Sequence, residues 1–355
     1  MRRILSLMLI VVFVACLAVL SGCGAAQQAA ATETKAEATK AETQAETKAE
    51  TKADAKAGAK LKVALLLPGT INDNGWNATA YNGIKLMEKD LGAEIAYSEK
   101  VAQSDQEEIF RNYVAQGYNF LIGHGFEFGD AAKRVAKDSP NAKFLITSTN
   151  ISQDPNLAST NTNPMQMGFL QGVASGLATK SNIIGAVGGM DIPPIVSAFQ
   201  GFEAGVKYVN PKAQVFTTKT GDFDDAVKAK EAAKALIGKG ADIVMLDADQ
   251  AGLGVIEACK EKGVYAMSSI APQHELAPDT VLGSGISDVP KAMELVAKHI
   301  VDGDFKAQFY DVGIKEGAVY FVANPKFESI YKEKIDQVMA DVKSGKLDIA
   351  ALAKK

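Results

Sequence analysis

Short apolar runs alternate with helix-like segments along the chain, and this alternation limits the fold more than any other feature. The first series consists of three apolar runs separated by two helical patterns, at residues 61–67, 77–91, 93–98, 105–116 and 119–122. Strand, helix, strand, helix and strand at short spacing predict parallel strands joined by right-handed crossovers. This part of the chain therefore predicts a doubly wound α/β unit.

The same order returns in the second half of the chain. The second series lies at residues 183–187, 195–208, 214–217, 224–237 and 242–246. In each series the loop after the first strand would lie at the carboxyl edge of its sheet, where open α/β sheets bind ligands. Two such edges that face one another predict two Rossmann-like, doubly wound lobes with a ligand cleft between them.

The first 23 residues have the pattern of an export signal. Met1-Arg2-Arg3 is basic, residues 4–20 carry no charge, and Leu20-Ser21-Gly22 precedes Cys23. A basic start, an apolar stretch and small residues are typical of a secretory leader, and the cysteine resembles that of a bacterial lipobox. The alternatives are a plain leader or a transmembrane anchor, although the apolar run is shorter than the roughly 20 residues that span a bilayer. We therefore expect a signal peptide at 1–22 and a lipid on Cys23, which would hold the protein on the extracytoplasmic face of the cell membrane.

Residues 24–60 repeat Ala, Glu, Thr and Lys and contain no large apolar side chain. Such a segment cannot bury enough surface to offset the entropy of ordering. A partner-binding helix would need an apolar stripe, which this segment lacks. The sequence therefore predicts a disordered tether over residues 23–60, with the lipid at its first residue.

The inventory of chemical motifs in the folded part argues against catalysis. His124, His274 and His299 belong to no metal-spacing motif, and no serine nucleophile elbow accompanies them. The glycines at 185–189 and 252–254 lack the full dinucleotide pattern. We therefore expect no catalytic residue, no cofactor and no metal. An enzyme on the same two-lobed body, such as a nucleoside-processing hydrolase, and a signalling lipoprotein remain as alternatives.

Charge and cysteine content exclude two further classes of site. The formal net charge is −4, which argues against a nucleic-acid surface. Cys259 is the only cysteine in the body, so neither an internal disulfide nor a thiolate metal cluster can form there.

Aromatic side chains follow the strands that should carry the cleft. Trp76 is the only tryptophan and ends the polar loop 72–75 after the first strand. It is either a cap on the core of its lobe or a stacking platform for a ligand. Phe126 and Phe128 follow the third strand and Phe223 precedes a helix of the second series, so they could line one cleft from both sides. An aromatic side chain that stacks on a base contributes roughly 1–3 kcal/mol.

Several blocks of the body resemble the basic membrane protein (BMP) family of ABC-transporter substrate-binding lipoproteins, which includes purine-nucleoside receptors. The blocks lie at residues 72–83, 123–136, 187–202 and 240–243. The resemblance implies a type I periplasmic-binding-protein fold in which the chain crosses between the lobes three times, near Asn161, Ile270 and Tyr310. It implies an N-terminal lobe of 61–161 plus 271–309 and a C-terminal lobe of 162–270 plus 310–355. It also implies an ABC permease and ATPase as partners, and we expect a monomer that binds no nucleic acid.

The resemblance also implies a set of ligand contacts. In this family the aromatic residue of the first-strand loop stacks on the base, which corresponds to Trp76, with polar contacts beside it and Phe223 on the opposing lobe. We expect the ligand to contact Asn72, Asp73, Asn74, Trp76, His124, Gly125, Phe126, Ser148, Met190, Phe223, Asp247 and Ala271.

The sequence departs from the nucleoside-binding members at three positions. Those members carry an Asp where this chain has Ser148, an Asp in the segment that is here Ile270-Ala271-Pro272, and a Lys where this chain has Ser287 or Asp288. The departures favour a free purine base, such as adenine or hypoxanthine, over a nucleoside. A receptor for another small planar or polar solute is the alternative.

Overall fold

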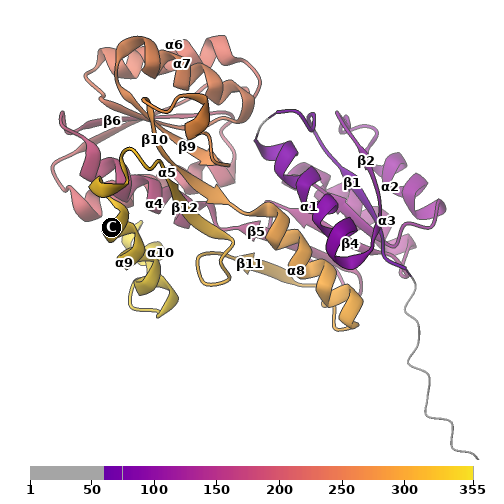
Figure 1. Cartoon of the computed structure of the whole chain (residues 1–355). Coiled ribbons are helices and arrows are strands. Elements are labelled where there is room, and N and C mark those ends of the chain that lie inside the picture. Colours follow the sequence, from indigo (N-terminus) through magenta and orange to yellow (C-terminus); the bar gives the residue numbers. More distant parts are fainter. Residues whose placement is uncertain (1–59, 74, 355) are drawn as a thin grey trace, which may run out of the picture. The chain divides into compact units, whose positions relative to one another are not determined.

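The computed structural model describes residues 60–73 and 75–354, which form two α/β lobes (Figure 1). The predictions for the signal peptide, for Cys23, for the tether and for Asn74 lie outside the described residues. None of the helices within those two ranges is long and apolar enough to cross a membrane.

The first lobe contains a six-stranded sheet in which all neighbouring strands are parallel. In sheet order its strands are β11 (Phe309–Val312), β5 (Leu157–Thr162), β4 (Lys143–Thr147), β3 (Phe120–Gly123), β1 (Lys62–Leu66) and β2 (Glu94–Ser98). Its helices are α1 (Trp76–Leu91), α2 (Gln106–Ala115), η1 (Phe126–Phe128), α3 (Gly129–Asp138) and α8 (Val289–Asp302). Alternate residues of β1 divide the core: Val63 and Leu65 pack with α1 and α8, whereas Ala64 and Leu66 pack with α2 and α3.

The second lobe contains another six-stranded sheet, in which only β12 runs antiparallel to its neighbour. In sheet order its strands are β12 (Val319–Ala323), β10 (Val281–Ser287), β9 (Tyr265–Ile270), β8 (Ile243–Asp247), β6 (Ile183–Gly188) and β7 (Gln214–Lys219). Its helices are α4 (Pro164–Ala178), α5 (Pro193–Val209), α6 (Ala226–Gly238), η2 (Asp249–Ala251), α7 (Gly252–Lys262), η3 (His274–Leu276), η4 (Glu328–Ile330), α9 (Lys332–Lys343) and α10 (Ile349–Leu352). The predicted fold class, two doubly wound α/β lobes, is confirmed.

Helices α4 and α5 of the second lobe touch through their backbones. A Cβ atom placed on Gly168 or Gly172 of α4, or on Gly201 or Gly205 of α5, would lie between 2.0 and 2.2 Å from a carbonyl oxygen of the other helix. Real atoms do not approach so closely, so only glycine permits this packing. The pair buries residues of α4 and α5 in the largest core of the lobe, which also contains residues of β6 and β8.

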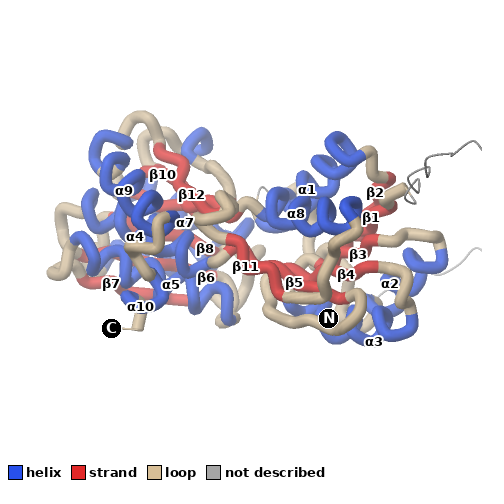
Figure 2. Tube along the Cα trace, turned by 90° about the horizontal axis from the view of Figure 1, so that it is seen from below, coloured by secondary structure: helices blue, strands red, loops and turns tan. Residues whose placement is uncertain are grey.

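The chain passes between the lobes after β5, after β10 and between β11 and β12. The expected lobe boundary at residue 271 is wrong, because β10 pairs with β9 and β12 in the second sheet. The reason is that β10, with the sequence VLGSGIS, carries glycines and serines in place of a continuous apolar run, so its strand character was not evident. The boundary at 310 also differs, since β11 pairs with β5 in the first sheet (Figure 2).

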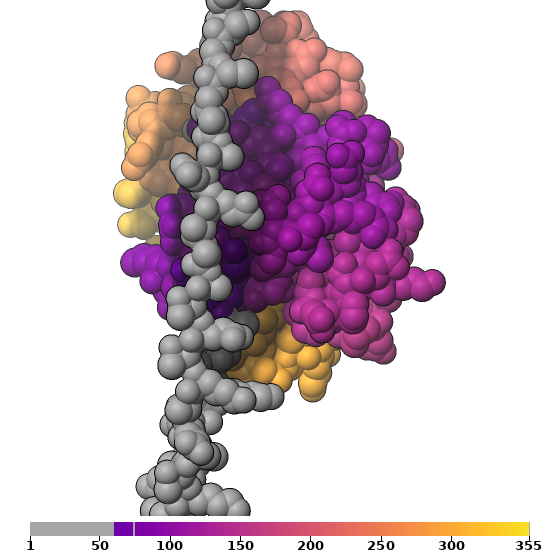
Figure 3. Space-filling view, turned by 90° about the vertical axis from the view of Figure 1, so that its right-hand side faces the viewer, coloured from indigo at the N-terminus to yellow at the C-terminus, as the bar shows by residue number. Residues whose placement is uncertain are grey.

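Helix α8 returns the chain to the first lobe. It packs with α1 over one face of the first sheet through Val289, Met293 and Val296. Figure 3, which looks onto this lobe, shows orange atoms of the α8 region next to the indigo and magenta atoms of the earlier segments. The first lobe is therefore completed by residues far along the chain.

Candidate ligand-binding cleft

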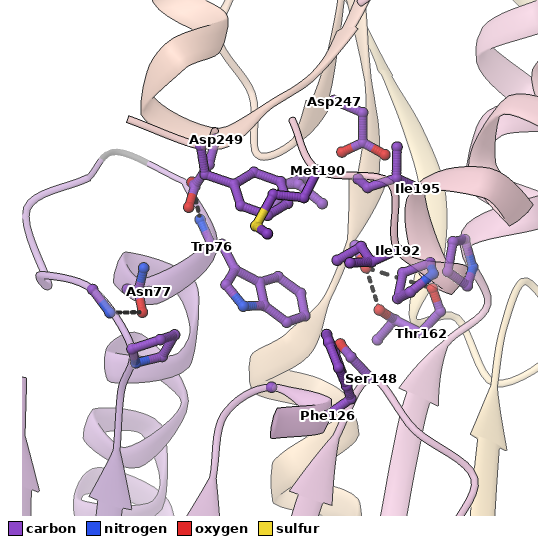
Figure 4. A pocket seen from close by; sticks show the side chains of 18 of the residues that line it. Trp76, Asn77, Phe126, Ser148, Thr162, Met190, Ile192, Ile195, Asp247 and Asp249 are labelled. Atoms are coloured by element: carbon purple, nitrogen blue, oxygen red, sulfur yellow. Dashed lines mark hydrogen bonds between the residues drawn. The ribbon is translucent and has the colours of Figure 1, made fainter. Parts of the chain in front are cut away.

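A cavity of about 400 Å³ lies where loops from both sheets meet (Figure 4). The first lobe lines it with the segments that follow β1, β3 and β4 and with the end of β5. The second lobe lines it with the segments that follow β6, β7 and β8 and with the last residues of β8, β9 and β10. Its size falls in the range of pockets that hold small molecules. Much of the wall is apolar and is formed by Pro68, Met167, Met190, Ile192, Ile195 and Ile270.

Trp76 begins helix α1 and presents its ring to the cavity (Figure 4). The indole stacks on the imidazole of His124, with ring centroids 4.0 Å apart and an angle of 26° between the planes. His124 does not line the cavity and has no exposed surface. One face of the indole is therefore covered by His124.

The hydrogen bonds of His124 define its protonation. Thr147 Oγ1 accepts from the N–H of Gly125 and lies 2.9 Å from His124 Nδ1. Because the neutral ring carries its proton on Nε2, the Thr147 hydroxyl donates to Nδ1. His124 Nε2 lies 3.0 Å from the carbonyl oxygen of Trp76, to which it donates. Burial lowers the pKa of His124 to about 3, so the ring is neutral. His124 thus holds both the ring and the backbone of Trp76.

Asp73 stabilises the start of α1. Its carboxylate accepts hydrogen bonds from the backbone N–H groups of Gly75, Asn77 and Ala78, at 3.0, 2.7 and 2.9 Å, and from the side-chain amide of Asn77 at 2.7 Å. A carboxylate at a helix N-terminus satisfies exposed N–H groups and opposes the helix dipole. Asp73 does not line the cavity, and its oxygens already have these four donors. The structure therefore gives Asp73 a capping position in place of the expected ligand contact.

The remaining predicted contacts divide between the cavity and other places. The cavity wall includes Trp76, Gly125, Phe126, Ser148, Met190, Phe223 and Asp247. Asn72 is exposed and does not line the cavity. Ala271 does not line the cavity either, whereas its neighbour Ile270 does. Phe128 is buried in the core of the first lobe, where it contacts Phe110 edge to face.

Asp249 is a cavity residue that sequence reasoning missed. Its Oδ1 accepts a hydrogen bond of 2.9 Å from the backbone N–H of Trp76, which joins the second lobe to the first. Burial, followed by repulsion from Asp73, raises the pKa of Asp249 to about 8. The only sequence signal was its place two residues after Asp247, at the carboxyl end of β8.

Asp247 also lines the cavity and is 6% exposed. Burial raises the pKa of this carboxyl to about 7. Within the part of the chain that the structure describes, no side chain or backbone group donates a hydrogen bond to its carboxylate, although its backbone carbonyl accepts from the N–H of Gly189. It therefore differs from Asp249, which has a donor in Trp76.

Unusual backbone conformations gather around the cavity. Ser148, Asp249 and Ile270 have φ values of 58°, 51° and 72°. Positive φ is uncommon outside glycine and is a true outlier for a β-branched residue such as Ile270. Strained residues of this kind cluster at ligand sites, where the surrounding structure holds them in place. The strained backbone therefore points to the same ligand-binding cavity as the side chains that line it.

Each of the three segments at which the sequence departs from nucleoside-binding members contributes a residue to this cavity, although Ala271, Pro272 and Asp288 do not line it. Ser148, Ile270 and Ser287 line it, and the Ser287 hydroxyl is hydrogen bonded to that of Thr162. Among the described residues that line the cavity, none is Lys, Arg or His. Nowhere in residues 60–73 and 75–354 is a group of three His, Cys, Asp or Glu side chains arranged to hold a metal ion.

Comparison with known proteins identifies relatives of this chain. The chain is similar to basic membrane protein A of Borreliella burgdorferi, with 31% identity over 79% of this chain and 85% of that one. It is 28% identical to the ABC transporter nucleoside-binding protein BmpA of Lactococcus lactis, over 81% of this chain and 89% of the relative. It is also 28% identical to a purine-binding protein of Brucella abortus, over 81% and 82%.

Solved structures show the same fold. A solute-binding protein of an ABC transporter system from Aeropyrum pernix K1 matches with a TM-score of 0.70 and 21% identity, over 81% of this chain and 92% of that one. A transcriptional activator of the comK gene from Bacillus halodurans matches with a TM-score of 0.71 and 22% identity, over 79% and 96%. At such identities the likeness shows the fold alone.

The family assignment rests on nearly the whole of the described chain. Residues 60–352 match the Bmp family, whose members are PnrA-like ABC transporter substrate-binding proteins. Such proteins bind small ligands for a permease and an ATPase, and the family is not one of enzymes. The chain belongs to the Bmp family of ABC transporter substrate-binding proteins.

Proposed function

We propose that this protein is the lipid-anchored receptor of an ABC importer and that it binds a free purine base and delivers it to the permease. The observation that carries the proposal is the indole of Trp76, which faces a cavity of about 400 Å³ and is covered on one side by His124. A planar heterocycle can stack on such a ring with a gain of about 1–3 kcal/mol. The names of the nucleoside-binding and purine-binding relatives agree with this ligand class.

The uncharged residues at three cavity positions favour a base over a nucleoside. The vicinal hydroxyls of a ribose are usually held by a carboxylate and a cation. Ser148, Ile270 and Ser287 line the cavity and belong to the segments in which nucleoside-binding members carry such groups, and Ser287 already bonds to Thr162. Each hydroxyl that is buried without its partner costs roughly 1–3 kcal/mol.

Adenine and hypoxanthine should therefore bind at least about tenfold more tightly than adenosine and inosine, which corresponds to about 1.4 kcal/mol. Calorimetry on protein that has been unfolded, freed of ligand and refolded measures both members of each pair. Tighter binding of the nucleosides would refute the preference for a base. Binding of neither class would refute the purine assignment.

Trp76→Ala should weaken a base and its nucleoside alike, by roughly 5-fold to 150-fold, because it removes the surface that stacks on the ring they share. The matched control is Tyr97→Ala, which also removes an exposed aromatic ring but lies on β2, away from the cavity residues. Competition calorimetry gives the affinities of both variants. If Trp76→Ala and Tyr97→Ala bind equally well, stacking on Trp76 is not the source of affinity.

Attachment to the membrane is proposed to depend on a lipid at Cys23. Cys23→Ser should therefore release the protein from membranes or leave an uncleaved precursor. Cys16→Ser, a change within the apolar run of the leader, is the control and should leave lipidation intact. Fractionation with metabolic labelling by a fatty acid distinguishes the products. A labelled, mature-sized Cys23→Ser protein in the membrane fraction would contradict the proposed anchor.

A further inference from the structure

The charge in the cavity is of one sign. Glu127, Asp224, Asp247 and Asp249 line it, and the described lining residues include no Lys, Arg or His. Carboxylates accept hydrogen bonds and, when ionised, donate none. These carboxylates can therefore recognise donors that a ligand carries, beside neutral polar groups of the wall such as Asn77, Ser148 and Thr162.

Three of these four carboxylates contact groups of the protein or are exposed to solvent. Asp249 accepts from the backbone N–H of Trp76 at 2.9 Å. Glu127 is half-buried, and its carboxylate lies so close to Gly125 that a Cβ there would be 2.3 Å from it. Asp224 is exposed to water. The fourth, Asp247, is buried at the cavity wall, and none of the described residues donates a hydrogen bond to its carboxylate.

The position of Asp247 is suited to a ligand that lies on Trp76. It ends β8 on the second lobe and lines the cavity together with Trp76 of the first lobe (Figure 4). With 6% of its surface exposed, it is removed from solvent almost completely. A buried carboxylate without a donor is costly, and the cost is removed when a donor arrives with the ligand.

The geometry of a carboxylate decides which donors fit. Its two oxygens lie in one plane and accept two parallel N–H groups from adjacent atoms, which is the strongest arrangement available to it. An amino group beside a ring N–H, as on the edge of guanine, presents two such donors. Hypoxanthine has the same ring but lacks the amino group, so it offers only one.

We propose that Asp247 is a specificity-determining residue that selects a heterocycle with two adjacent N–H donors, so that guanine binds more tightly than hypoxanthine. The inference rests on the proposed function, because it assumes that the ligand is a purine-type ring stacked on Trp76. It goes beyond that function by naming the edge of the ring that the protein recognises and the residue that recognises it.

The test uses the fluorescence of Trp76, the only tryptophan in the chain, excited at the red edge of indole absorption where purines absorb little. Ligand-free wild-type protein is titrated with guanine and with hypoxanthine. Guanine should bind at least about tenfold more tightly, as expected when one charge-assisted hydrogen bond in a buried site is lost. Asp247→Asn should remove this preference, mainly by weakening guanine, because an amide offers only one acceptor atom. Asp90→Asn, a change at an exposed carboxylate of α1 that does not line the cavity, should retain the preference.

A second measurement needs no variant. 1-Methylguanine keeps the amino group but lacks the adjacent N–H, so it should bind wild-type protein at least about tenfold more weakly than guanine. If guanine, hypoxanthine and 1-methylguanine bind with equal affinity, the inference about Asp247 is overturned while purine binding stands. If Asp247→Asn folds and keeps the preference for guanine, the inference is overturned as well. If no purine binds, the proposed function fails, and the inference fails with it.

Discussion

Gly172→Ala should lower the free energy of unfolding by about 2–3 kcal/mol, toward the upper end of the range for an overfilled core. The new Cβ would lie 2.1 Å from the carbonyl oxygen of Phe202 and 2.8 Å from the backbone nitrogen of Val206. Both atoms belong to the backbone of α5, so no side chain can rotate away. The helices must therefore separate, and the core that they share with β6 and β8 loses contacts.

Gly238→Ala is the matched control for this substitution. Gly238 ends helix α6, and a Cβ placed there would meet no atom within 4 Å. Alanine in a helix is favoured over glycine by roughly 0.5–1 kcal/mol, so this variant should be as stable as the wild type or slightly more stable. Urea unfolding followed by circular dichroism gives both values. Equal midpoints for Gly172→Ala and the wild type would show that α4 and α5 tolerate a wider separation.

The free energy of unfolding should fall by about 2–3 kcal/mol as the pH rises from about 6.5 to about 8.5, because two buried carboxyls lose protons in this range. Burial raises the pKa of Asp247 from 3.8 to about 7 and that of Asp249 from 3.8 to about 8. Below these folded values the folded protein holds protons that the unfolded chain has already released. Stability is therefore lost as the pH rises toward each folded pKa, and the loss is complete above it.

His124 sets the lowest pH at which the effect of the two carboxyls on the free energy of unfolding can be measured alone. Its pKa is lowered from 6.5 to about 3 in the folded protein, so it costs stability as the pH falls below 6.5. That effect opposes the effect of the two carboxyls, whereas above 6.5 the carboxyls act alone. Asp249→Asn should flatten the decline, because the amide does not titrate and its oxygen still accepts from the N–H of Trp76. Urea unfolding of ligand-free protein at several pH values measures the slope. A variant whose slope equals that of the wild type would show that Asp249 does not cause the decline.

The local pattern of the sequence was sufficient to predict the two α/β units. Apolar runs such as that at 61–67 and helical patterns such as that at 77–91 became β1 and α1, because burial on both faces of a parallel sheet requires continuous apolar residues. The same reasoning predicted that ligand-facing residues would follow the strands. Trp76, Phe126 and Phe223 do lie at the cavity.

Other features depend on segments that are far apart in the sequence. β10 has glycines and serines where a strand pattern needs apolar residues, and its pairing with β9 and β12 assigns it to the second lobe. The glycines of α4 and α5 become informative only when the two helices are seen in contact. No periodicity within one segment reports on such contacts, since each partner looks ordinary by itself.

The roles of the polar residues were decided in the same way. Asp73 stood in the loop beside Trp76 and was expected to touch the ligand, yet its oxygens bind the N-terminus of α1. Asp249 accepts a hydrogen bond from the N–H of Trp76, which is 173 residues away in the sequence, and His124 stacks on the indole ring. By itself the sequence determined which segments are strands and helices and where the carboxyl edges lie, because hydrophobic periodicity is local. Only the tertiary structure decided which polar groups are already satisfied by the protein and which remain for a ligand, because a hydrogen bond depends on the distance between atoms that the sequence separates.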